Sequence, residues 1–265
     1  MSASRLALLT AMMLLPAPVL AQAIQCTPPA RIDSYPPINP DGPPRRTPIG
    51  GYTLALSWSP EFCRTARGPG STLQCGGGNG RFGFIVHGLW PEAGNGPSPQ
   101  WCAFAPNARV PRPSPDLLRR HLCMTPSART LEHEWLKHGS CATRSPEEYF
   151  GATARLWQGL RMPNTQELSR RPGLTAGDLR QAFVTANPSL APDMIGIKTS
   201  PGNWLREVTL CYSAALKPTP CQRWQLGARD HMALRIGMGG RADHNSRLGD
   251  SGWTNQRYEN SGMRR

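Results

Sequence analysis

Two short segments decide the interpretation of this chain: FIVHGLWP at residues 84–91 and EHEWLKHGSC at residues 132–141. They contain three of the six histidines of the sequence, together with carboxylates, a lysine and a cysteine. The pattern of residues 82–86 is that of a strand, which would deliver His87 to its end, whereas residues 129–138 have a helical pattern. One strand end and one helix therefore carry groups that donate a proton, accept a proton or bear positive charge.

The spacing within the second segment directs four polar groups toward one cleft. On an α-helix Glu134 and His138 lie four residues apart and share a stripe, as do His133 and Lys137. The two stripes are about 100° apart, so both can face the same cleft. A zinc protease would need the pattern His-Glu-x-x-His, with its histidines four residues apart. Here the histidines are five residues apart, which favours two separate histidine functions.

These residue types match what the cleavage of RNA requires. A base removes the proton of the ribose 2′-hydroxyl, whose oxygen attacks the adjacent phosphorus, and an acid protonates the departing 5′-oxygen. Histidine suits both roles because its ordinary pKa of about 6.5 leaves both protonation states populated near neutrality. Lys137 and His133 offer cationic donors for the charge on phosphorus, and Glu134 can hold a neighbouring imidazole or lysine in its charged form. Trp90 offers a face on which a base can stack, and this chemistry needs no metal or other cofactor.

On the residues alone, the three histidines could also serve in two different ways. His87, His133 and His138 could have purely structural roles, or they could together bind a zinc ion.

The remaining patterns predict an α+β fold. Alternation of apolar and polar residues predicts strands at 52–58, 82–86, 194–198, 204–212 and 232–238. Helical periodicity and start signals predict helices at 114–123, 129–138, 146–160 and 176–186. Because strands and helices do not alternate strictly, we expect a central, mainly antiparallel β-sheet flanked by several α-helices.

The first 23 residues are typical of a secretory signal peptide. Arg5 marks a charged start, residues 6–20 carry no charge, and small residues stand at the cleavage positions Ala21 and Ala23. The apolar run is too short for a transmembrane helix and contains two prolines. Eight cysteines, an even number, fit a disulfide-bonded exported protein. We therefore expect a periplasmic or secreted protein with no stable membrane association once the signal is removed.

Composition divides the rest of the chain into three parts. Residues 24–48 are rich in proline and predict an extended N-terminal arm. Residues 49–238 have the size of one catalytic domain, and residues 239–265 predict a disordered basic tail. The formal net charge of +13 favours a polyanionic partner such as RNA, and we expect a monomer.

The two segments resemble the active-site segments of the ribonuclease T2 family, secreted endoribonucleases of bacteria, fungi and plants. Residues 84–91 match the family pattern aromatic-x-hydrophobic-His-Gly-Leu-Trp-Pro throughout. Residues 132–141 match Glu-His-Glu-Trp-x-Lys-His-Gly-Thr-Cys except at Ser140. Residues 54–63 also resemble the first strand of the family, whereas Thr130 and Leu131 replace its usual aromatic pair.

This resemblance implies a ribonuclease T2-like fold and metal-independent cleavage of RNA through a 2′,3′-cyclic phosphate. It implies a separate role for each residue of the site. His87 would be the general acid, His138 the general base and His133 a phosphate ligand. Glu134 and Lys137 would stabilise the pentacoordinate state, Trp90 would stack on a base, and Glu92 would help to read that base.

The resemblance also implies a pairing of the cysteines, for which eight residues allow 105 connectivities. The implied bridges are Cys102–Cys141, Cys63–Cys75 and Cys211–Cys221, which leaves Cys26 with Cys123.

Two further functions stay open on the sequence. One is a catalytically silent RNA-binding or signalling protein on the same scaffold, and its signature would be the loss of a catalytic histidine. The other is a metal-dependent periplasmic nuclease, which would be sensitive to chelators and would also cleave DNA.

Overall fold

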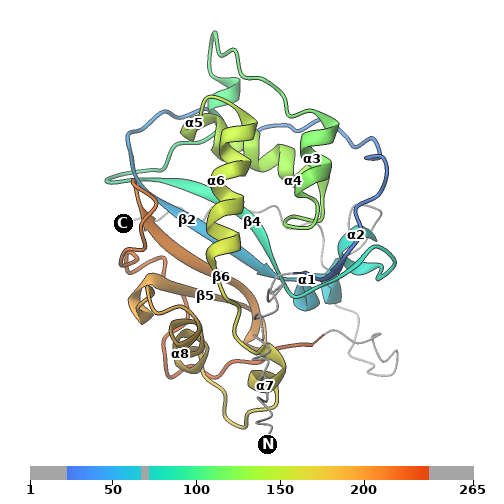
Figure 1. Ribbon diagram of the computed structural model, residues 1–265. Helices are drawn as coiled ribbons and strands as arrows, with labels where there is room; N and C mark the ends of the chain where they lie inside the picture. Colours follow the sequence, from blue (N-terminus) through green and yellow to red (C-terminus); the bar gives the residue numbers. More distant parts are fainter. Residues whose placement is uncertain (1–22, 67–71, 239–265) are drawn as a thin grey trace, which may run out of the picture.

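The computed structural model describes residues 23–66 and 72–238, and the expected α+β class is confirmed (Figure 1). The predicted signal peptide, apart from its last residue, and the predicted tail at 239–265 lie outside the described residues. No helix within the described ranges has the length and apolar character needed to cross a membrane.

Four antiparallel strands form the central sheet in the order β4-β2-β6-β5. They are β2 (Ile49–Trp58), β4 (Phe84–Ala93), β5 (Ile195–Ser200) and β6 (Trp204–Ser213). A second, two-stranded sheet pairs β1 (Ala23–Cys26) with β3 (Gly80–Phe82). The N-terminal arm therefore begins as a strand that is paired with the domain.

Helices surround this sheet, with α3, α4 and α5 gathered on the β4 side and α8 beside β5 (Figure 1). Several begin at a serine, threonine or asparagine whose side chain accepts the hydrogen bond of a first-turn amide, and Thr175 and Asp178 form a capping box on α8. The helices are α1 (Ser59–Thr65), α2 (Thr72–Cys75), α3 (Pro115–His121), α4 (Ala128–Glu134), α5 (Ser140–Ala142), α6 (Pro146–Gly159), α7 (Thr165–Ser169) and α8 (Ala176–Ala186), with short turns η2 (Cys102–Phe104), η3 (Trp135–Gly139) and η4 (Pro192–Met194).

The two faces of the sheet differ in chemistry. Leu54 and Leu56 of β2 lie opposite Leu89 and Val86 of β4, and all four are buried in the core. Phe183 of α8 reaches this core, with its ring centroid 5.6 Å from that of Phe84. Because side chains alternate along a strand, the neighbouring residues face the other side, and several of these are polar.

The outer edge of β4 is covered by the helical side of the molecule. The amide of Val86 donates to the carbonyl of Met124, and the Thr125 hydroxyl donates to the carbonyl of Val86. The hydroxyl of Tyr149 on α6 both donates to the carbonyl of Leu89, at 3.0 Å, and accepts from its amide, at 3.1 Å. An edge strand exposes unpaired backbone N–H and C=O groups. At the edge of β4 these contacts supply hydrogen bonds that a further strand would otherwise make.

Two sequence predictions for the strands are wrong. Of the strand expected at 82–86, Phe82 ends β3, whereas β4 begins at Phe84 and continues to Ala93, so His87 lies inside a strand rather than at its end. No strand forms at 232–238, where only isolated bridges link Ala233 to Thr175 and Arg235 to Trp204. Leu234 and Ile236 of this segment are nevertheless buried in the core.

The helix expected at 129–138 is also different. The α-helix α4 ends at Glu134, and the chain continues through η3, a π-helical turn at Trp135–Gly139. Gly139 occupies its last position, and a β-carbon there would come 2.5 Å from the Trp135 ring and 2.6 Å from Tyr149. The helix can therefore pass Tyr149 only with glycine at this position.

Four disulfides are present, of which Cys26–Cys123 and Cys102–Cys141 join distant segments, and Cys63–Cys75 and Cys211–Cys221 close short loops. They are the four pairs that the resemblance implies.

The proline-rich arm lies against the domain. Ile38 is buried in the core, and the backbone of Arg45 pairs with that of Gln100. Cys26 ties its first strand to Cys123.

Candidate active site

His87 belongs to an irregularity in β4. Gly88 pairs with Ala55 and Val86 pairs with Leu56, so His87 is an extra residue with no partner on β2. Such a β-bulge re-aims a side chain and is common beside active sites. It allows His87 to lie on the same face as Trp90, three residues further on, with their ring centroids 5.2 Å apart.

Gly88 lets α4 approach this strand closely. A β-carbon at Gly88 would overlap with the carboxylate of Glu134 and come 2.6 Å from the indole nitrogen of Trp90. In the gap that glycine leaves, Trp90 Nε1 donates a hydrogen bond of 2.8 Å to Glu134 Oε2. The glycine of the His-Gly-Leu-Trp motif thus brings the strand and the helix into contact.

Glu134 lies between the two histidines. Its Oε1 is 3.6 Å from His87 Nε2, and its Oε2 is 3.9 Å from His138 Nε2. Both imidazoles therefore turn the same nitrogen toward one buried carboxylate, from β4 on one side and η3 on the other. The expected grouping of Glu134 with His138 holds, although the backbone between them is partly π-helical.

The surroundings of His87 favour its protonated form. Burial alone would lower its pKa, but the hydrogen bond to Glu207 and the charges of Glu134 and Glu207 outweigh burial and raise the pKa of His87 above its ordinary value. The Nδ1–H donates to Glu207 Oε2 at 3.0 Å, since an ionised carboxylate can only accept. When the ring is protonated, the second proton is on Nε2, which faces Glu134.

His138 has the opposite tendency. Burial, followed by the positive charges of Lys137, His133 and His87, lowers the pKa of His138 well below its ordinary value. Its Nδ1 is buried and has no hydrogen-bond partner among the described residues. His138 is therefore neutral near pH 7, and its Nε2 is the nitrogen that faces Glu134.

Lys137 and His133 are the two residues that the sequence predicts to be cationic, and Asp41 of the arm contacts Lys137. Lys137 Nζ donates to Asp41 Oδ2 at 2.6 Å, and Trp101 Nε1 donates to Asp41 Oδ1 at 2.7 Å. The His133 ring packs edge-on against Trp101, with centroids 5.1 Å apart. Burial and the Lys137 charge lower the pKa of His133 to about 4, so this histidine is neutral near pH 7 rather than cationic.

Trp90 and Glu92 follow His87 on the same strand, β4. Lys198 of β5 places its ammonium 5.2 Å from the centre of the Trp90 ring. Glu92 accepts hydrogen bonds from the hydroxyls of Thr53 and Ser98, at 2.7 and 2.6 Å. The carboxylate of Glu92 is thus held in one orientation, two residues beyond Trp90.

Three residues of this site were missed by the sequence interpretation: Asp41, Lys198 and Glu207. Asp41 lies in a segment interpreted as an extended arm, and Lys198 and Glu207 lie in strands without a recognisable motif. Lys198 and Glu207 pair directly across β5 and β6, which is the signal that a strand alignment would have offered.

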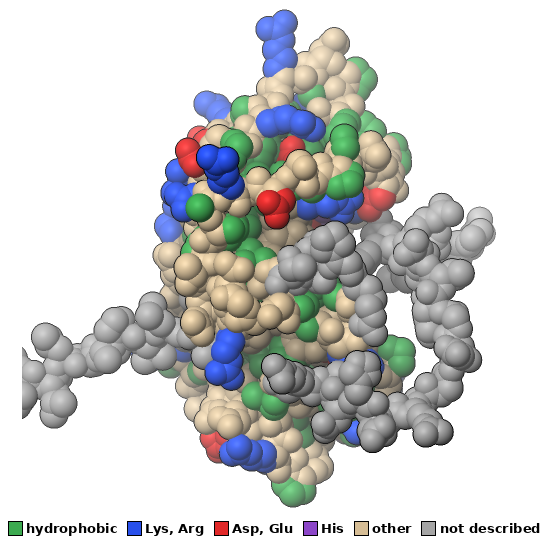
Figure 2. Space-filling view, turned by 90° about the vertical axis from the view of Figure 1, so that its right-hand side faces the viewer, with side chains coloured by type: hydrophobic (Ala, Val, Ile, Leu, Met, Phe, Trp, Pro, Cys, Tyr) green, Lys and Arg blue, Asp and Glu red, His purple; other side chains and the backbone are tan. Residues whose placement is uncertain are grey.

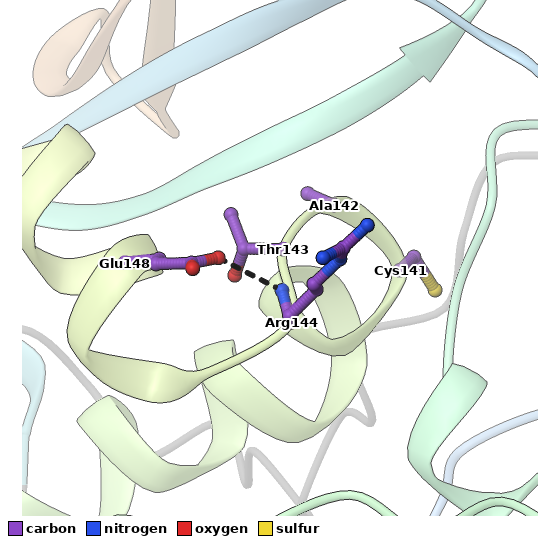
Figure 3. Close-up of a pocket in the computed structure, with 5 residues that line it drawn as sticks. All are labelled: Cys141, Ala142, Thr143, Arg144 and Glu148. Carbon is purple, nitrogen blue, oxygen red and sulfur yellow. Dashed lines mark hydrogen bonds between the residues drawn. The ribbon is translucent and has the colours of Figure 1, made fainter.

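Charged side chains are spread over the face of the molecule in Figure 2. Figure 2 shows Lys and Arg side chains at several separate places on one face, with fewer Asp and Glu among them. An open depression is lined by Cys141, Ala142, Thr143, Arg144 and Glu148 (Figure 3). Within it Glu148 accepts a hydrogen bond from the Arg144 amide, and the histidines of the site are not among its lining residues. Among the described residues, no group of three or more His, Cys, Asp or Glu side chains is arranged to hold a metal ion.

The fold and the site together define a class: an α+β protein in which two imidazoles flank one buried carboxylate. Comparison with known families narrows this class. The sequence pattern of the Ribonuclease T2 family matches residues 49–186, which is 138 of the 265 residues, and the chain belongs to that family.

Curated relatives agree with this assignment. A protein of Haemophilus influenzae named "Probable ribonuclease" is 39% identical over 136 residues, which cover 47% of this chain and 48% of that protein. "Ribonuclease T2" of Sus scrofa is 30% identical over 115 residues, covering 38% of this chain and 56% of that protein. The chain thus spans about half the length of the curated relatives that it matches.

Solved structures share the fold. Trichomaglin, described as a novel S-like ribonuclease, superimposes with a TM-score of 0.53 at 19% identity, covering 71% of this chain and 98% of that one. RNase NT, solved in complex with 5′-AMP, gives a TM-score of 0.51 at 21% identity, covering 71% of this chain and 99% of that one. At these identities the likeness shows the common fold.

Proposed function

We propose that the protein is a metal-independent endoribonuclease that cleaves RNA by transesterification through a 2′,3′-cyclic phosphate. The observation that carries this proposal is the pair His87 and His138. Their Nε2 atoms face the same carboxylate, and their pKa values are shifted in opposite directions. Groups whose environments separate their pKa values in this way are suited to act as the acid and the base of one reaction.

Each step then has a residue in the required protonation state. His138 Nε2 takes the proton of the 2′-hydroxyl, and the 2′-oxygen forms a bond to phosphorus. The bond from phosphorus to the 5′-oxygen breaks, and His87 Nε2 gives its proton to that oxygen. Hydrolysis of the cyclic phosphate runs the same transfers in reverse, with water in place of the 5′-hydroxyl. Proton transfer by a positioned side chain contributes about 10²–10⁴-fold to each step.

The remaining residues bind the substrate in this proposal. His133, neutral at pH 7, binds the phosphate through a ring N–H, and Lys137 supplies positive charge beside it. Glu134 keeps the two histidines in place around the pentacoordinate state. Trp90 stacks on a base, and Glu92, fixed by two hydroxyl donors, accepts hydrogen bonds from the edge of that base.

The same proposal includes the cellular setting. The signal-like residues 1–23 and the four disulfides support export to the periplasm or the medium, where thiols are oxidised. There the chain acts as a monomer on RNA.

One incubation tests the activity. The purified protein is mixed with an RNA oligonucleotide, and separately with its 2′-deoxy counterpart, in excess EDTA. We expect RNA fragments that end in a 2′,3′-cyclic phosphate and an intact deoxy strand, because the attacking oxygen is the 2′-hydroxyl. Cleavage of the deoxy strand, or inhibition by EDTA, would indicate a metal-dependent nuclease. Binding of RNA without cleavage would indicate a catalytically silent scaffold, and either result would overturn the proposal.

A further inference from the structure

Glu207 lies outside both motifs of the sequence, but its carboxylate contacts His87. It lies on β6, two strands away from His87 in the order β4-β2-β6. Neighbouring strands are about 4.8 Å apart, so the two side chains must meet above β2. The residues of β2 beneath them are Ala55 and Ser57, whose small side chains leave room for this contact.

The contact between His87 and Glu207 is short, and Glu207 is buried. His87 Nδ1 lies 3.0 Å from Glu207 Oε2, and only 8% of the Glu207 side chain is exposed. A buried carboxylate is costly unless it is paired and hydrogen-bonded. Glu207 meets this requirement on both oxygens, because Lys198 Nζ donates to its Oε1 at 3.0 Å. Lys198 and Glu207 stand opposite each other across β5 and β6, so their pairing is built into the strand register.

We propose that Glu207 is the positioning residue of His87: it accepts the Nδ1–H, so that the ring presents its Nε2–H toward Glu134 and the reacting phosphate, and Lys198 fixes the carboxylate in that orientation. This inference rests on the proposed function, because it assigns His87 the role of general acid. The tautomer and ring orientation of a histidine are set by the hydrogen bond of its second nitrogen, and Glu207 makes that bond.

Other charged groups also face His87, and their effects differ in sign. Glu134 on α4 and Glu207 on β6 favour the protonated ring, whereas Lys198 on β5 disfavours it. His133 and His138 lie near enough to be influenced by the charge of His87 and form the opposite side of the site. Burial raises the pKa of Glu207, but the hydrogen bond and charge of His87, together with those of Lys198, outweigh burial and lower this pKa to about 2. The carboxylate is therefore ionised wherever the enzyme would work.

Glu207 and Lys198 shift the pKa of His87 in opposite directions, and this difference provides the test of the positioning role. In the full-length protein without RNA, the titration of the His87 imidazole is followed by NMR in the wild type, in Glu207→Gln and in Lys198→Met. We expect Glu207→Gln to lower the pKa of His87 by about 1–3 pH units, the range found for removal of an adjacent opposite charge. Lys198→Met should shift it upward. A general loss of structure would not move the same titration in two directions.

Kinetics on a dinucleoside phosphate give the second measurement. In Glu207→Gln the alkaline limb of kcat/KM should move to lower pH, with about a tenfold loss of rate for each pH unit of the shift when assayed above the new limb. The acid limb, which belongs to His138, should stay in place, and KM should change less than kcat. Glu61→Gln is the matched control, because Glu61 is also a buried carboxylate but is bonded to Arg64 and Ser200. It should leave the alkaline limb and the His87 titration unchanged.

The outcomes separate this inference from the proposed function. A wild-type protein that titrates as described but does not cleave RNA would end the proposed function and leave the His87–Glu207 interaction established. An active wild type whose His87 titration and alkaline limb are the same in Glu207→Gln would overturn the positioning role alone. A shift of equal size in Glu61→Gln would also overturn it.

Discussion

Replacing Tyr149 by phenylalanine should destabilise the protein far more than the loss of one hydroxyl suggests. The Tyr149 hydroxyl accepts from the Leu89 amide and donates to the Leu89 carbonyl, at the edge of β4 between His87 and Trp90. Tyr149 is 2% exposed, and its pKa is raised well above the ordinary value, first by burial and then by the charge of Glu134. The hydroxyl thus stays protonated and bonds both backbone groups of Leu89.

The two hydrogen bonds of Tyr149 determine how much stability Tyr149→Phe is expected to lose. Removing the hydroxyl leaves one buried donor and one buried acceptor without a partner, and each such group costs about 1–3 kcal/mol. The free energy of unfolding should therefore fall by roughly 2–6 kcal/mol. For a domain of this size, even the lower value corresponds to a decrease in Tm of about 4–8 °C.

Urea unfolding with the disulfides intact measures this change, and hydrogen exchange at the Leu89 amide localises it. Tyr212→Phe is the matched control, because Tyr212 is also buried, at 4% exposure, but its hydroxyl has no hydrogen bond to another described residue. We expect the control to cost less than about 1 kcal/mol. If both variants lose the same stability, the hydroxyl of Tyr149 does not take the place of a neighbouring strand, and our account of the covered edge is wrong.

Three further predictions concern the site. His87→Phe and His138→Phe should each lower kcat/KM on RNA by about 10²–10⁴-fold with unchanged circular dichroism, and a fully active variant would refute the assigned role. The pH profile of kcat/KM should be bell-shaped, with an acid limb below pH 6.5 from His138 and an alkaline limb above it from His87, because the pKa values of these histidines are lowered and raised, respectively. Glu207 has an ordinary pKa of 4.5 that folding lowers to about 2, so its stabilisation is complete above pH 4.5 and is lost as the pH falls toward 2. The stability difference between wild type and Glu207→Gln, from urea unfolding at a series of pH values, should shrink over that range, and a constant difference would contradict it.

The sequence predicted the groups of the site better than their geometry. The residues of the two motifs could be assigned to one cleft, because a helical repeat alone brings Glu134 and His138 together. The β-bulge at His87 could not be foreseen, since a strand pattern shows alternation but not the residue at which the register shifts. The π-helical turn at Trp135–Gly139 was hidden for a similar reason: the segment has an ordinary helical composition, and its hydrogen bonding depends on packing against Tyr149.

The sequence did not predict three residues of the site, Asp41, Lys198 and Glu207, because tertiary contacts alone bring them there. Asp41 reaches Lys137 across 96 residues of sequence, and Glu207 reaches His87 across 120. Neither contact follows from a local repeat.

One of these missed residues, Glu207, helps to shift the pKa values of His87 and His138 in opposite directions. Glu134 is close to both rings, and its charge raises the pKa of His87, whereas burial is the largest influence on the pKa of His138. The two rings also differ in the surroundings of their second nitrogen. His87 Nδ1 donates to the ionised Glu207, whereas His138 Nδ1 is buried without a partner among the described residues and close to Lys137. Glu207, outside the two motifs, thus favours the protonated form of His87, whereas burial and the charges of Lys137, His133 and His87 favour the neutral form of His138, as the proposed acid and base require.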